Sequence, residues 1–484
     1  MKLVKNRYFL LFAVSFAVFS LASWERFPKP SRHFHFIDLA NSFLNLRLDT
    51  DTPRLSKFSA QKEDAARGLA GAVRRHLTEK DGKDVGWNDW ASFRIIKLKD
   101  GGTVKGIYPW GGSGSSDRFI FRTFENTEMV IDPDFDIAGF CGESGGKQCD
   151  ETKYYVSFPP FPALLMMPLF PFLGYNLNDV IFTIIFASLN TILLFFLLER
   201  LSRDGVTSRT RNENILLSLL FSFGTVNFFS AVRGEVWFTA LIIGITLNIL
   251  YIFFATGARR PLLAGLFLAF GFATRTTLAF TAIFFAMELL CANVSIREKF
   301  RKGVLFAAPI LAAGAILMIF NHARFDNPFE FGHTYLMEGR RGSIRDFGLF
   351  HPEFLKYNVK AAFLNLPGIS LEEPFLRISR HGLSFVFCTL PLLFVLAPKR
   401  LNSFYLRLAV TAVAVAIPLL LYQNTGWAQF GYRFSLDFMP YLFVMLAVSG
   451  RKFGRVFILL AGVAFAVNLF GAVAYDRFDQ FFYD

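Results

Sequence analysis

Long runs of apolar residues recur along most of this chain and are separated by short polar connectors. One apolar run follows the basic start MKLVKNR, and ten further candidate spans come later in the chain. These ten cover about residues 179–199, 214–232, 235–256, 261–275, 277–293, 303–320, 382–397, 403–421, 434–449 and 454–474. A helix needs about 20 apolar residues to cross about 30 Å of hydrocarbon. The pattern therefore predicts an all-α polytopic membrane protein with about eleven transmembrane helices.

The long apolar runs stop between about residues 48 and 156, where the composition is that of a soluble segment. Residues 62–77 place apolar side chains on one helical face, whereas residues 92–110 alternate like two strands joined at Asp100-Gly101-Gly102. Residues 118–124 and 128–132 offer two further strands. The pattern predicts a small α+β extramembrane insertion after the first helix.

Basic residues gather in every second connector between the apolar runs. The clusters are Arg200, Arg203, Arg209 and Arg211; Arg259 and Arg260; Arg297, Lys299, Arg301 and Lys302; Lys399 and Arg400; and Arg451, Lys452 and Arg455. Cytoplasmic loops of membrane proteins carry the excess of Lys and Arg. We therefore expect a multi-pass protein of a bacterial cytoplasmic membrane, with the N terminus in the cytoplasm and the large loop and the C terminus outside.

The stretch YYVSFPPFPALLMMPLF, residues 154–170, follows the polar segment directly and carries several prolines. Its apolar run from Phe161 to Leu173 would reach only about 20 Å as a helix, and Pro168 and Pro171 would kink or end that helix. The span at 179–199 must also begin outside in order to end at the cytoplasmic cluster of Arg200, so residues 161–173 cannot cross the membrane before it. We predict an interfacial or re-entrant helix, with Ser157 as its cap and free amides at its start that suit a lipid phosphate.

These patterns divide the chain into six parts. They are the first transmembrane helix and a surface helix (1–47), the periplasmic α+β insertion (48–156), the interfacial or re-entrant helix (157–178), transmembrane helices (179–320), an outer loop region (321–381) and C-terminal transmembrane helices (382–484).

The composition agrees with that of a membrane protein and leaves the predicted fold class unchanged. The chain is 53% hydrophobic and has a net charge of +13. Since the basic residues lie in short clusters between apolar runs, nucleic acid is not an expected partner. Cys141 and Cys149 lie close together in the Gly-rich stretch CGESGGKQC, and their spacing predicts a disulfide if this loop faces an oxidising compartment.

One acidic stretch has part of the spacing of a calcium-binding loop. In DPDFDIAGFCGE, carboxylates stand at loop positions 1, 3, 5 and 12, namely Asp132, Asp134, Asp136 and Glu143. Ile137 occupies the sixth position, where such loops need glycine. We therefore expect no metal and no cofactor, and keep a divalent cation only as a weak alternative.

The order of several stretches resembles a known family. An acidic, aromatic surface helix in the large outer loop (FHFIDLANSFLNLRLD) is followed by the Pro-Pro stretch YYVSFPPFPALLMMPL and by a helix with a basic end, FFLLERLSR. This order is similar to the GT-C superfamily, which includes protein O-mannosyltransferases and lipid A aminoarabinose transferases. The resemblance covers about residues 8–320, and more loosely NHARFDNPFEFGHTYL and GWAQFGYRFSLDFMPYL.

The resemblance implies that an acidic residue near the start of the first outer loop acts as the catalytic base. Asp38 is the first such residue, with Asp49 and Asp51 as alternatives, although the polar face of an amphipathic helix also explains Asp38. The stretch WAQFGYRF resembles the family's late outer loop, which implies that Tyr432 and Arg433 contact the donor.

Two further groups of residues are assigned from the pattern. Arg275 is the only charge in about 27 residues, and an arginine at membrane depth normally faces a polar cavity or an anion. We therefore place Arg275 with Ser157, Tyr432 and Arg433 at the donor phosphate. On the acceptor side we place the polar residues at the outer end of another span: His322, Arg324, Glu330 and His333. The spacings of Arg233 with Glu235, and of Arg433 with Asp437, predict two ion pairs.

These residues predict a membrane glycosyltransferase. The expected donor is a polyprenyl-phosphate-linked sugar in the membrane lipid, and the acceptor is a lipid, glycan or protein. A transporter or flippase of lipid-linked intermediates is the alternative from another class. A catalytically inactive relative that binds lipid is the third, because SRHFHF and Phe158 depart from the family's usual acidic pair and Lys.

Overall fold

The computed structural model describes most of the chain. The described residues are 2–51, 53, 74, 79–80, 83–84, 90–109, 116–138, 149–336 and 342–483. They divide into two compact units, each of which is described by itself. The helical unit comprises residues 1–31, 178–314 and 350–484, and the mixed unit comprises residues 32–177 and 315–349.

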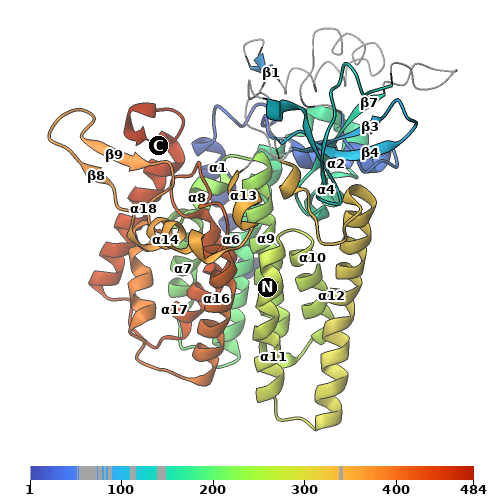
Figure 1. Cartoon of the computed structure of the whole chain (residues 1–484). Coiled ribbons are helices and arrows are strands. Elements are labelled where there is room, and N and C mark those ends of the chain that lie inside the picture. Colours follow the sequence, from blue (N-terminus) through green and yellow to red (C-terminus); the bar gives the residue numbers. More distant parts are fainter. Residues whose placement is uncertain are drawn as a thin grey trace. The chain divides into compact units, whose positions relative to one another are not determined.

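The fold is mostly helical, and five helices in the described part of the chain are long and apolar enough to cross a membrane. They are α6 (Asp179–Arg203), α9 with its 3-10 extension (Glu235–Ala258), α12 (Ile296–Phe325), α16 (Ser403–Leu420) and α18 (Arg455–Ala474). Figure 1 shows α6, α9, α16 and α18 among the helices of the helical unit, and α6 packs against α9. A multi-pass membrane protein is thus supported by the length and apolar character of these helices.

The predicted number of eleven spans is not shown, because several apolar runs form shorter helices. These are the apolar part of α1 (Arg7–Ala22 within Lys2–Ala22), α7 (Arg211–Phe223), α8 (Asn227–Ala231), α10 (Pro261–Phe272), α11 (Ala282–Cys291), α15 (Phe385–Cys388) and α17 (Met439–Val448). The predicted span 214–232 is divided where α7 ends at Gly224. The predicted span 382–397 is divided at Thr389, between α15 and the 3-10 helix η8 (Leu390–Leu396).

Polar side chains join the helices in the core of the helical unit. Thr183 on α6 lies 2.7 Å from the hydroxyl of Thr239 on α9. Asn190 on α6 donates to the carbonyl of Ile242 at 3.0 Å and accepts from Thr246 at 2.6 Å. Hydrogen bonds of this kind hold helices together where the surroundings are as apolar as the helix surfaces.

The run around Arg275 forms a hairpin. This is one of the two arrangements that its sequence allows, and the other is one long helix. α10 ends at Phe272, Arg275 has an extended backbone, and the 3-10 helix η4 (Thr276–Thr281) leads into α11. α10 and η4 pack against each other. Arg275 therefore lies at the turn of a helical hairpin and not in the middle of one long helix.

The mixed unit contains a five-stranded antiparallel sheet in the order β6-β5-β4-β3-β7. Its strands are β3 (Trp90–Lys97), β4 (Thr103–Ile107), β5 (Ile120–Thr123), β6 (Glu128–Val130) and β7 (Asp150–Val156). The predicted turn at Asp100-Gly101-Gly102 and the strands within 92–110, 118–124 and 128–132 are confirmed. The strand β7, which pairs with β3, was missed, and the predicted helix at 62–77 lies outside the described residues apart from position 74.

The Pro-rich stretch forms short helices and no crossing. α4 (Phe161–Met166), α5 (Phe170–Leu173) and the 3-10 helix η2 (Gly174–Asn176) follow one another, with a break at each proline-containing turn. The amphipathic helix α2 (His35–Leu44) packs against α4. The prediction that this stretch is not a transmembrane helix agrees with these lengths.

The remaining described elements are short. They are β1 (Glu79–Lys80), β2 (Lys83–Asp84), η1 (Ser116–Phe119), η5 (His333–Tyr335), α13 (Gly342–Phe347), η6 (Pro352–Phe354), α14 (Leu355–Val359), η7 (Lys360–Leu364), β8 (Gly368–Ile369), β9 (Leu376–Ser379), η9 (Arg433–Asp437), η10 (Asp479–Phe481) and β10 (Phe482–Tyr483).

Candidate functional site

Asp38 forms a buried ion pair with Arg74. Asp38 lies in the first turn of α2, and the side chains of Asp38 and Arg74 are only 1% and 0% exposed. Arg74 donates through Nε to Oδ1 of Asp38 at 3.0 Å and through Nη2 to Oδ2 at 3.1 Å. The same Nη2 donates to the carbonyl of Asp51 at 2.9 Å. Arg74 thus ties α2 to the acidic stretch that follows this helix.

Tyr175 completes the surroundings of Asp38. The phenol of Tyr175 donates to Oδ1 of Asp38 at 2.7 Å and accepts from the amide of Asn41 at 3.1 Å. Burial, and then the charge of Asp38, raise the pKa of Tyr175 well above its usual value. Tyr175 therefore stays protonated at neutral pH and continues to donate its hydrogen bond to Asp38.

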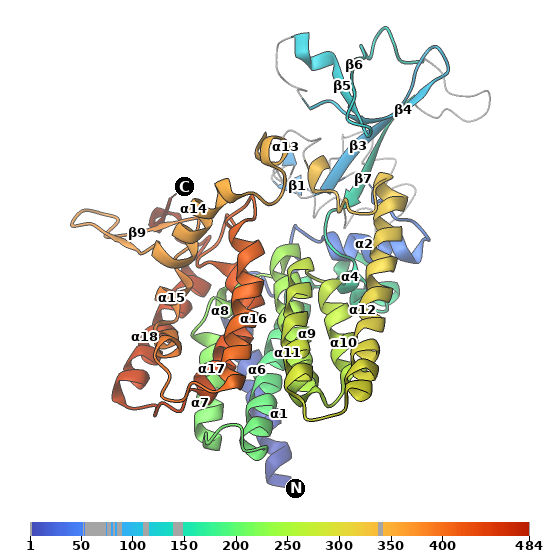
Figure 2. The ribbon, with the colours of Figure 1, turned by 60° about the horizontal axis from the view of Figure 1, so that its bottom comes forward.

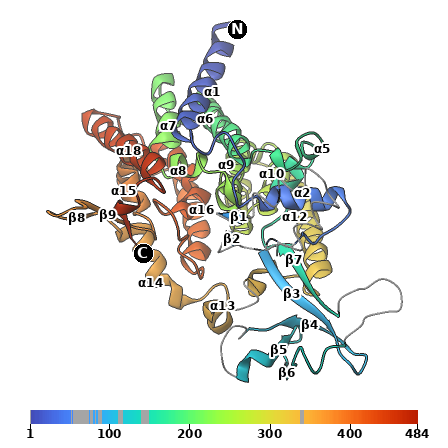
Figure 3. The ribbon, with the colours of Figure 1, turned by 90° about the horizontal axis from the view of Figure 1, so that it is seen from above.

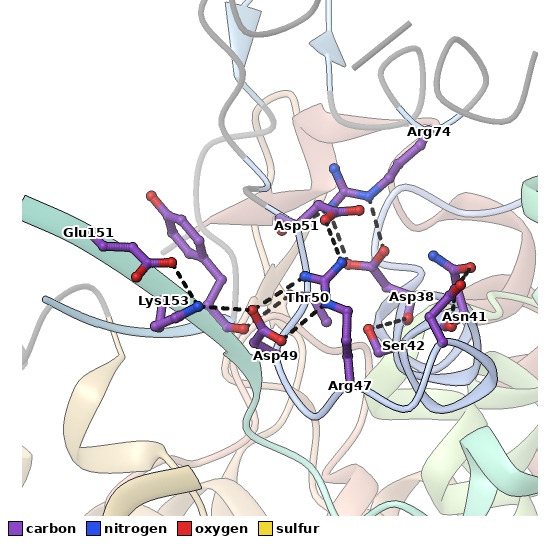
Figure 4. Close-up of polar contacts among 12 residues, drawn as sticks. Asp38, Asn41, Ser42, Arg47, Asp49, Thr50, Asp51, Arg74, Glu151 and Lys153 are labelled. Carbon is purple, nitrogen blue, oxygen red and sulfur yellow. Dashed lines mark hydrogen bonds and ion pairs between the residues drawn. The ribbon is translucent and has the colours of Figure 1, made fainter. Parts of the chain in front are cut away.

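Asp49 and Asp51 lie beside Arg47 at a partly exposed position (Figure 4). Arg47 donates to both oxygens of Asp49, at 3.2 and 3.3 Å, and to Oδ1 of Asp51 at 3.1 Å. Lys153 on β7 lies 3.6 Å from Asp49 and 2.7 Å from Glu151. Burial alone would raise the pKa of Asp49, but Arg47 and Lys153 outweigh it and hold that pKa below its usual value.

We expect Tyr175→Phe to lower the free energy of unfolding of the mixed unit by about 1–3 kcal/mol, because Asp38 loses a hydrogen bond to a charged group. Thermal unfolding of the purified protein in detergent measures this. Tyr154→Phe, in the same unit, is the control, since this substitution removes no hydrogen bond to Asp38. Equal midpoints for the two variants would show that Tyr175 does not support Asp38.

The Pro-Pro stretch begins with a short helix that lacks the predicted cap. The first helix in it, α4, has Pro160 as its N-cap and no side-chain cap, so Ser157 does not cap it. α4 has six residues, too few for an anion site at its N terminus to be argued from helix geometry alone. Ser157 itself is fully buried.

The residues predicted for the acceptor side have separate surroundings. Arg324 is buried and donates to the carbonyl of Val156 at 2.7 Å and to Asn321 at 2.8 Å, which ties the end of α12 to β7. Glu330 accepts from the amide of Gly332 and from the hydroxyl of Thr334 and so closes its own turn. His322 is exposed and His333 is partly exposed.

In the helical unit, Arg275 pairs with Asp437 across the fold. Nε and Nη2 of Arg275 lie 2.6 and 2.7 Å from the two carboxylate oxygens of Asp437, and Thr277 donates to the same carboxylate at 2.7 Å. The predicted pair of Arg433 with Asp437 is therefore wrong, because the carboxylate of Asp437 is taken by Arg275. Arg275 enters the candidate site with its charge already balanced.

Arg433 lies in the same cluster but has no ion pair among the described residues. It is 5% exposed, donates through Nη1 to the carbonyl of Ala428 at 3.3 Å, and its Nε has no hydrogen-bond partner in the described part of the chain. Its guanidinium carbon lies 4.9 Å from the ring of Phe238 and 5.6 Å from that of Phe434. Burial, and then the charge of Arg275, lower the pKa of Arg433 to about 10. At neutral pH it remains a buried cation.

Two other predictions concern the surroundings of Arg433. Tyr432 is buried and its phenol donates to the carbonyl of Leu419 at 3.4 Å. The predicted pair of Arg233 with Glu235 is confirmed at 3.3 Å, and Asp476 contacts the same guanidinium at 2.7 Å. The ring of Phe238 lies between the guanidinium groups of Arg233 and Arg433, at 5.1 and 4.9 Å.

The described residues hold no group of three or more His, Cys, Asp or Glu side chains arranged for a metal ion. Asp132 accepts from the amide of Asp134 at 3.0 Å, Asp136 accepts from the amide of Asp132 at 2.7 Å, and Glu143 lies outside the described residues. Cys149 is disulfide-bonded, whereas its predicted partner Cys141 also lies outside the described residues.

The predicted site residues thus fall into two sets. Asp38, Asp49 and Asp51 are brought together by Arg74 and Arg47 in the mixed unit, whereas Arg275 and Arg433 meet around Phe434 in the helical unit. The sequence reasoning missed several residues that hold these sets in place. They are Asn41, Arg47, Arg74, Lys153, Tyr175 and Thr277, while Asp437 was named with Arg433 as its partner. Asn41, Arg47 and Thr277 had local signals, since Asn41 stands one helical turn after Asp38, Arg47 two residues before Asp49, and Thr277 two residues after Arg275.

Comparison with protein-family models, with curated proteins and with solved structures finds no match for this chain.

Proposed function

We propose that this protein is an integral membrane glycosyltransferase of the GT-C type. It transfers a sugar from a polyprenyl-phosphate donor to a lipid, glycan or protein acceptor at the outer face of the membrane. In this proposal the shorter apolar helices add to the five long ones to give about eleven crossings, and the basic connectors face the cytoplasm. The resemblance of the sequence to that family and the two charged sets support the proposal.

The observation that carries the proposal is the buried cation of Arg433. A buried charge without a counter-ion is costly, and neighbouring aromatic rings offset only part of that cost. Arg233 and Arg275 already hold the carboxylates of Glu235, Asp476 and Asp437, whereas Arg433 has no carboxylate partner among the described residues. A phosphate of the donor lipid would supply that negative charge.

Transfer to a hydroxyl also needs a carboxylate. The base takes the proton of the acceptor as its oxygen attacks the anomeric carbon, and the bond from that carbon to the phosphate oxygen breaks. A cation then stabilises the phosphate that leaves. Asp51 is the strongest choice for the base, because Asp38 is buried against Arg74 and because the lowered pKa of Asp49 weakens it as a proton acceptor.

Binding and turnover of labelled polyprenyl-phosphate sugars test the proposal. Purified protein is expected to bind and turn over at least one sugar of a panel, and Arg433→Met is expected to weaken donor binding about 10- to 100-fold. In the absence of donor, Arg433→Met is expected to keep or raise the thermal midpoint, because it removes a cation that lacks a counter-ion.

Arg324→Met is the matched control, since Arg324 is equally buried but bonds Val156 and Asn321. We expect it to lower the thermal midpoint by leaving those acceptors without a donor. Donor binding that is unaffected by Arg433→Met would remove Arg433 from the site, and no binding of any donor would contradict the proposed function.

One observation favours an inactive lipid-binding relative as the second candidate. Both oxygens of Asp38, the residue that the family resemblance implies as the base, are occupied by Arg74 and Tyr175. Tight binding of a polyprenyl-phosphate sugar without turnover, under conditions in which Arg433→Met abolishes binding, would support this candidate over the enzyme.

A further inference from the structure

Residues 350–379 of the helical unit, here called the lateral segment, expose many large apolar side chains. The segment runs through η6, α14 and η7 into the hairpin of β8 and β9. Its exposed apolar residues include Leu355, Tyr357, Phe363, Leu364, Ile369 and Leu371, of which Ile369 is 86% and Leu371 97% exposed. Single exposed apolar residues are ordinary on a protein surface, but a continuous series of them marks an interaction site.

In a helix that faces water the large apolar side chains point inward, whereas in the lateral segment many of them point outward. Along α14 and η7 the buried side chains are small or polar, since Asn358, Ala361 and Ala362 are each 1% exposed, whereas Phe354 and Ile378 are buried nearer the two ends of the segment. Its outward side carries the large apolar residues together with exposed Lys356 and Lys360. Lysines beside outward Leu, Phe and Tyr are typical of a helix that lies in the plane of a membrane surface.

Two attachments place the lateral segment at the ends of two candidate spans. Asn358 donates at 2.7 Å to the carbonyl of Tyr422, which lies two residues beyond the end of α16. β9 pairs with β10 (Phe482–Tyr483), which follows α18 along the chain, and the amide of Arg380 donates to the carbonyl of Tyr483 at 2.8 Å. The segment is therefore attached to the stretches of chain that follow α16 and α18.

The outer sides of these two helices are apolar as well, with exposed Val413 and Ile417 on α16 and Leu459 and Leu469 on α18. Figures 2 and 3 show the hairpin of β8 and β9 projecting from the helical unit. Exposed apolar residues thus occur both on the sides of these helices and on the lateral segment that is attached to the chain after them.

We propose that the lateral segment lies in the boundary between lipid headgroups and acyl chains, in the leaflet that surrounds the C-terminal ends of α16 and α18. The attachment of the segment to the chain that follows two candidate spans, which themselves expose apolar side chains, favours lipid over a protein partner. Lys360 is placed for lipid phosphates, whereas Lys356 is paired with Glu353 at 2.7 Å. Glu372 and Glu373, next to Leu371, keep the hairpin tip from entering the hydrocarbon more deeply. The outer loop region predicted at 321–381 would then be partly a membrane-surface element, whatever reaction the protein performs.

Site-directed fluorescence in nanodiscs tests this proposal. Full-length protein with the exposed Cys291 replaced by serine receives one new cysteine, at Ile369 or at Leu371, and an environment-sensitive label. Val130 on β6, 73% exposed and outside the lateral segment, is the matched control position. Lipids with a quencher near the glycerol end of the acyl chain are expected to quench labels at 369 and 371 several-fold more than a label at 130. Aqueous iodide is expected to show the opposite order.

Two results would overturn the proposal. Strong iodide quenching at 369 and 371 without lipid quenching would place the hairpin in water. Protection from both quenchers would mean that a protein, either another copy or a different chain, covers the hairpin. Size-exclusion elution identical to that of the parent protein shows that each labelled variant is folded.

Discussion

Asp51→Asn is expected to slow sugar transfer by about 10²- to 10⁴-fold, the usual contribution of a general base, with donor binding retained. The substitution removes the proton acceptor but keeps the size of the side chain. Arg47 still has Asp49 as a partner, so folding is expected to survive. Single-turnover transfer from a labelled polyprenyl-phosphate sugar measures the rate, and binding of the same donor is measured separately.

Asp49→Asn and Asp38→Asn are the controls for this prediction. Asp49→Asn leaves Arg47 paired with Asp51 and Lys153 paired with Glu151, so we expect most of the activity to remain. Asp38→Asn removes the buried carboxylate that accepts two hydrogen bonds from Arg74 and is expected to lower the thermal midpoint. A folded Asp38→Asn variant without activity, beside an active Asp51→Asn variant, would instead assign the base to Asp38.

Local patterns in the sequence were sufficient for the elements that depend on local chemistry. The turn at Asp100-Gly101-Gly102 follows from glycine at the tight connection, and Gly101 has the positive φ of 92° that this position requires. The proline-containing stretch after residue 159 was recognised as too short and too interrupted for a crossing. The helices α6, α9, α16 and α18 were recognised because apolar residues occur on all sides of each helix, which makes the whole run apolar in sequence.

Hydropathy alone could not separate long helices from broken ones. The runs at 214–232 and 382–397 are apolar throughout, but their continuity depends on backbone breaks at Gly224 and Thr389. The strand β7 was missed because DETKYYV is polar at its start, and because its pairing with β3 joins residues about 60 positions apart.

Partners of the charged residues were the least predictable part of the candidate site. Asp437 lies four residues after Arg433, which favoured a local pair, but it bonds Arg275 from a distant part of the chain. Arg74 reaches Asp38 across 36 positions, and Tyr175 reaches it across 137. No spacing rule connects such residues, because only the packing of helices and loops brings them together.

Asp437→Asn is expected to lower the free energy of unfolding of the helical unit by about 3–5 kcal/mol, because it leaves the guanidinium of Arg275 without its carboxylate in a largely buried place. The double variant Arg275→Met with Asp437→Asn is expected to be less destabilised than either single variant, since both charges are removed together. Thermal unfolding of all four proteins in the same detergent gives the coupling energy. Glu298→Gln, which breaks an exposed pair with Arg301, is the control and is expected to leave the midpoint unchanged.

The coupling energy also shows which arginine of the helical unit has a positive charge available to an external anion. A large coupling energy means that Asp437 neutralises Arg275, which leaves the charge of Arg433 for an external anion. If the coupling energy is near zero, Arg275 is not bound to Asp437 in solution, and both arginines face the anion site. Arg433→Met alone would then weaken donor binding only slightly, whereas Arg275→Met with Arg433→Met would abolish it. The two measurements together identify the cation that meets the phosphate.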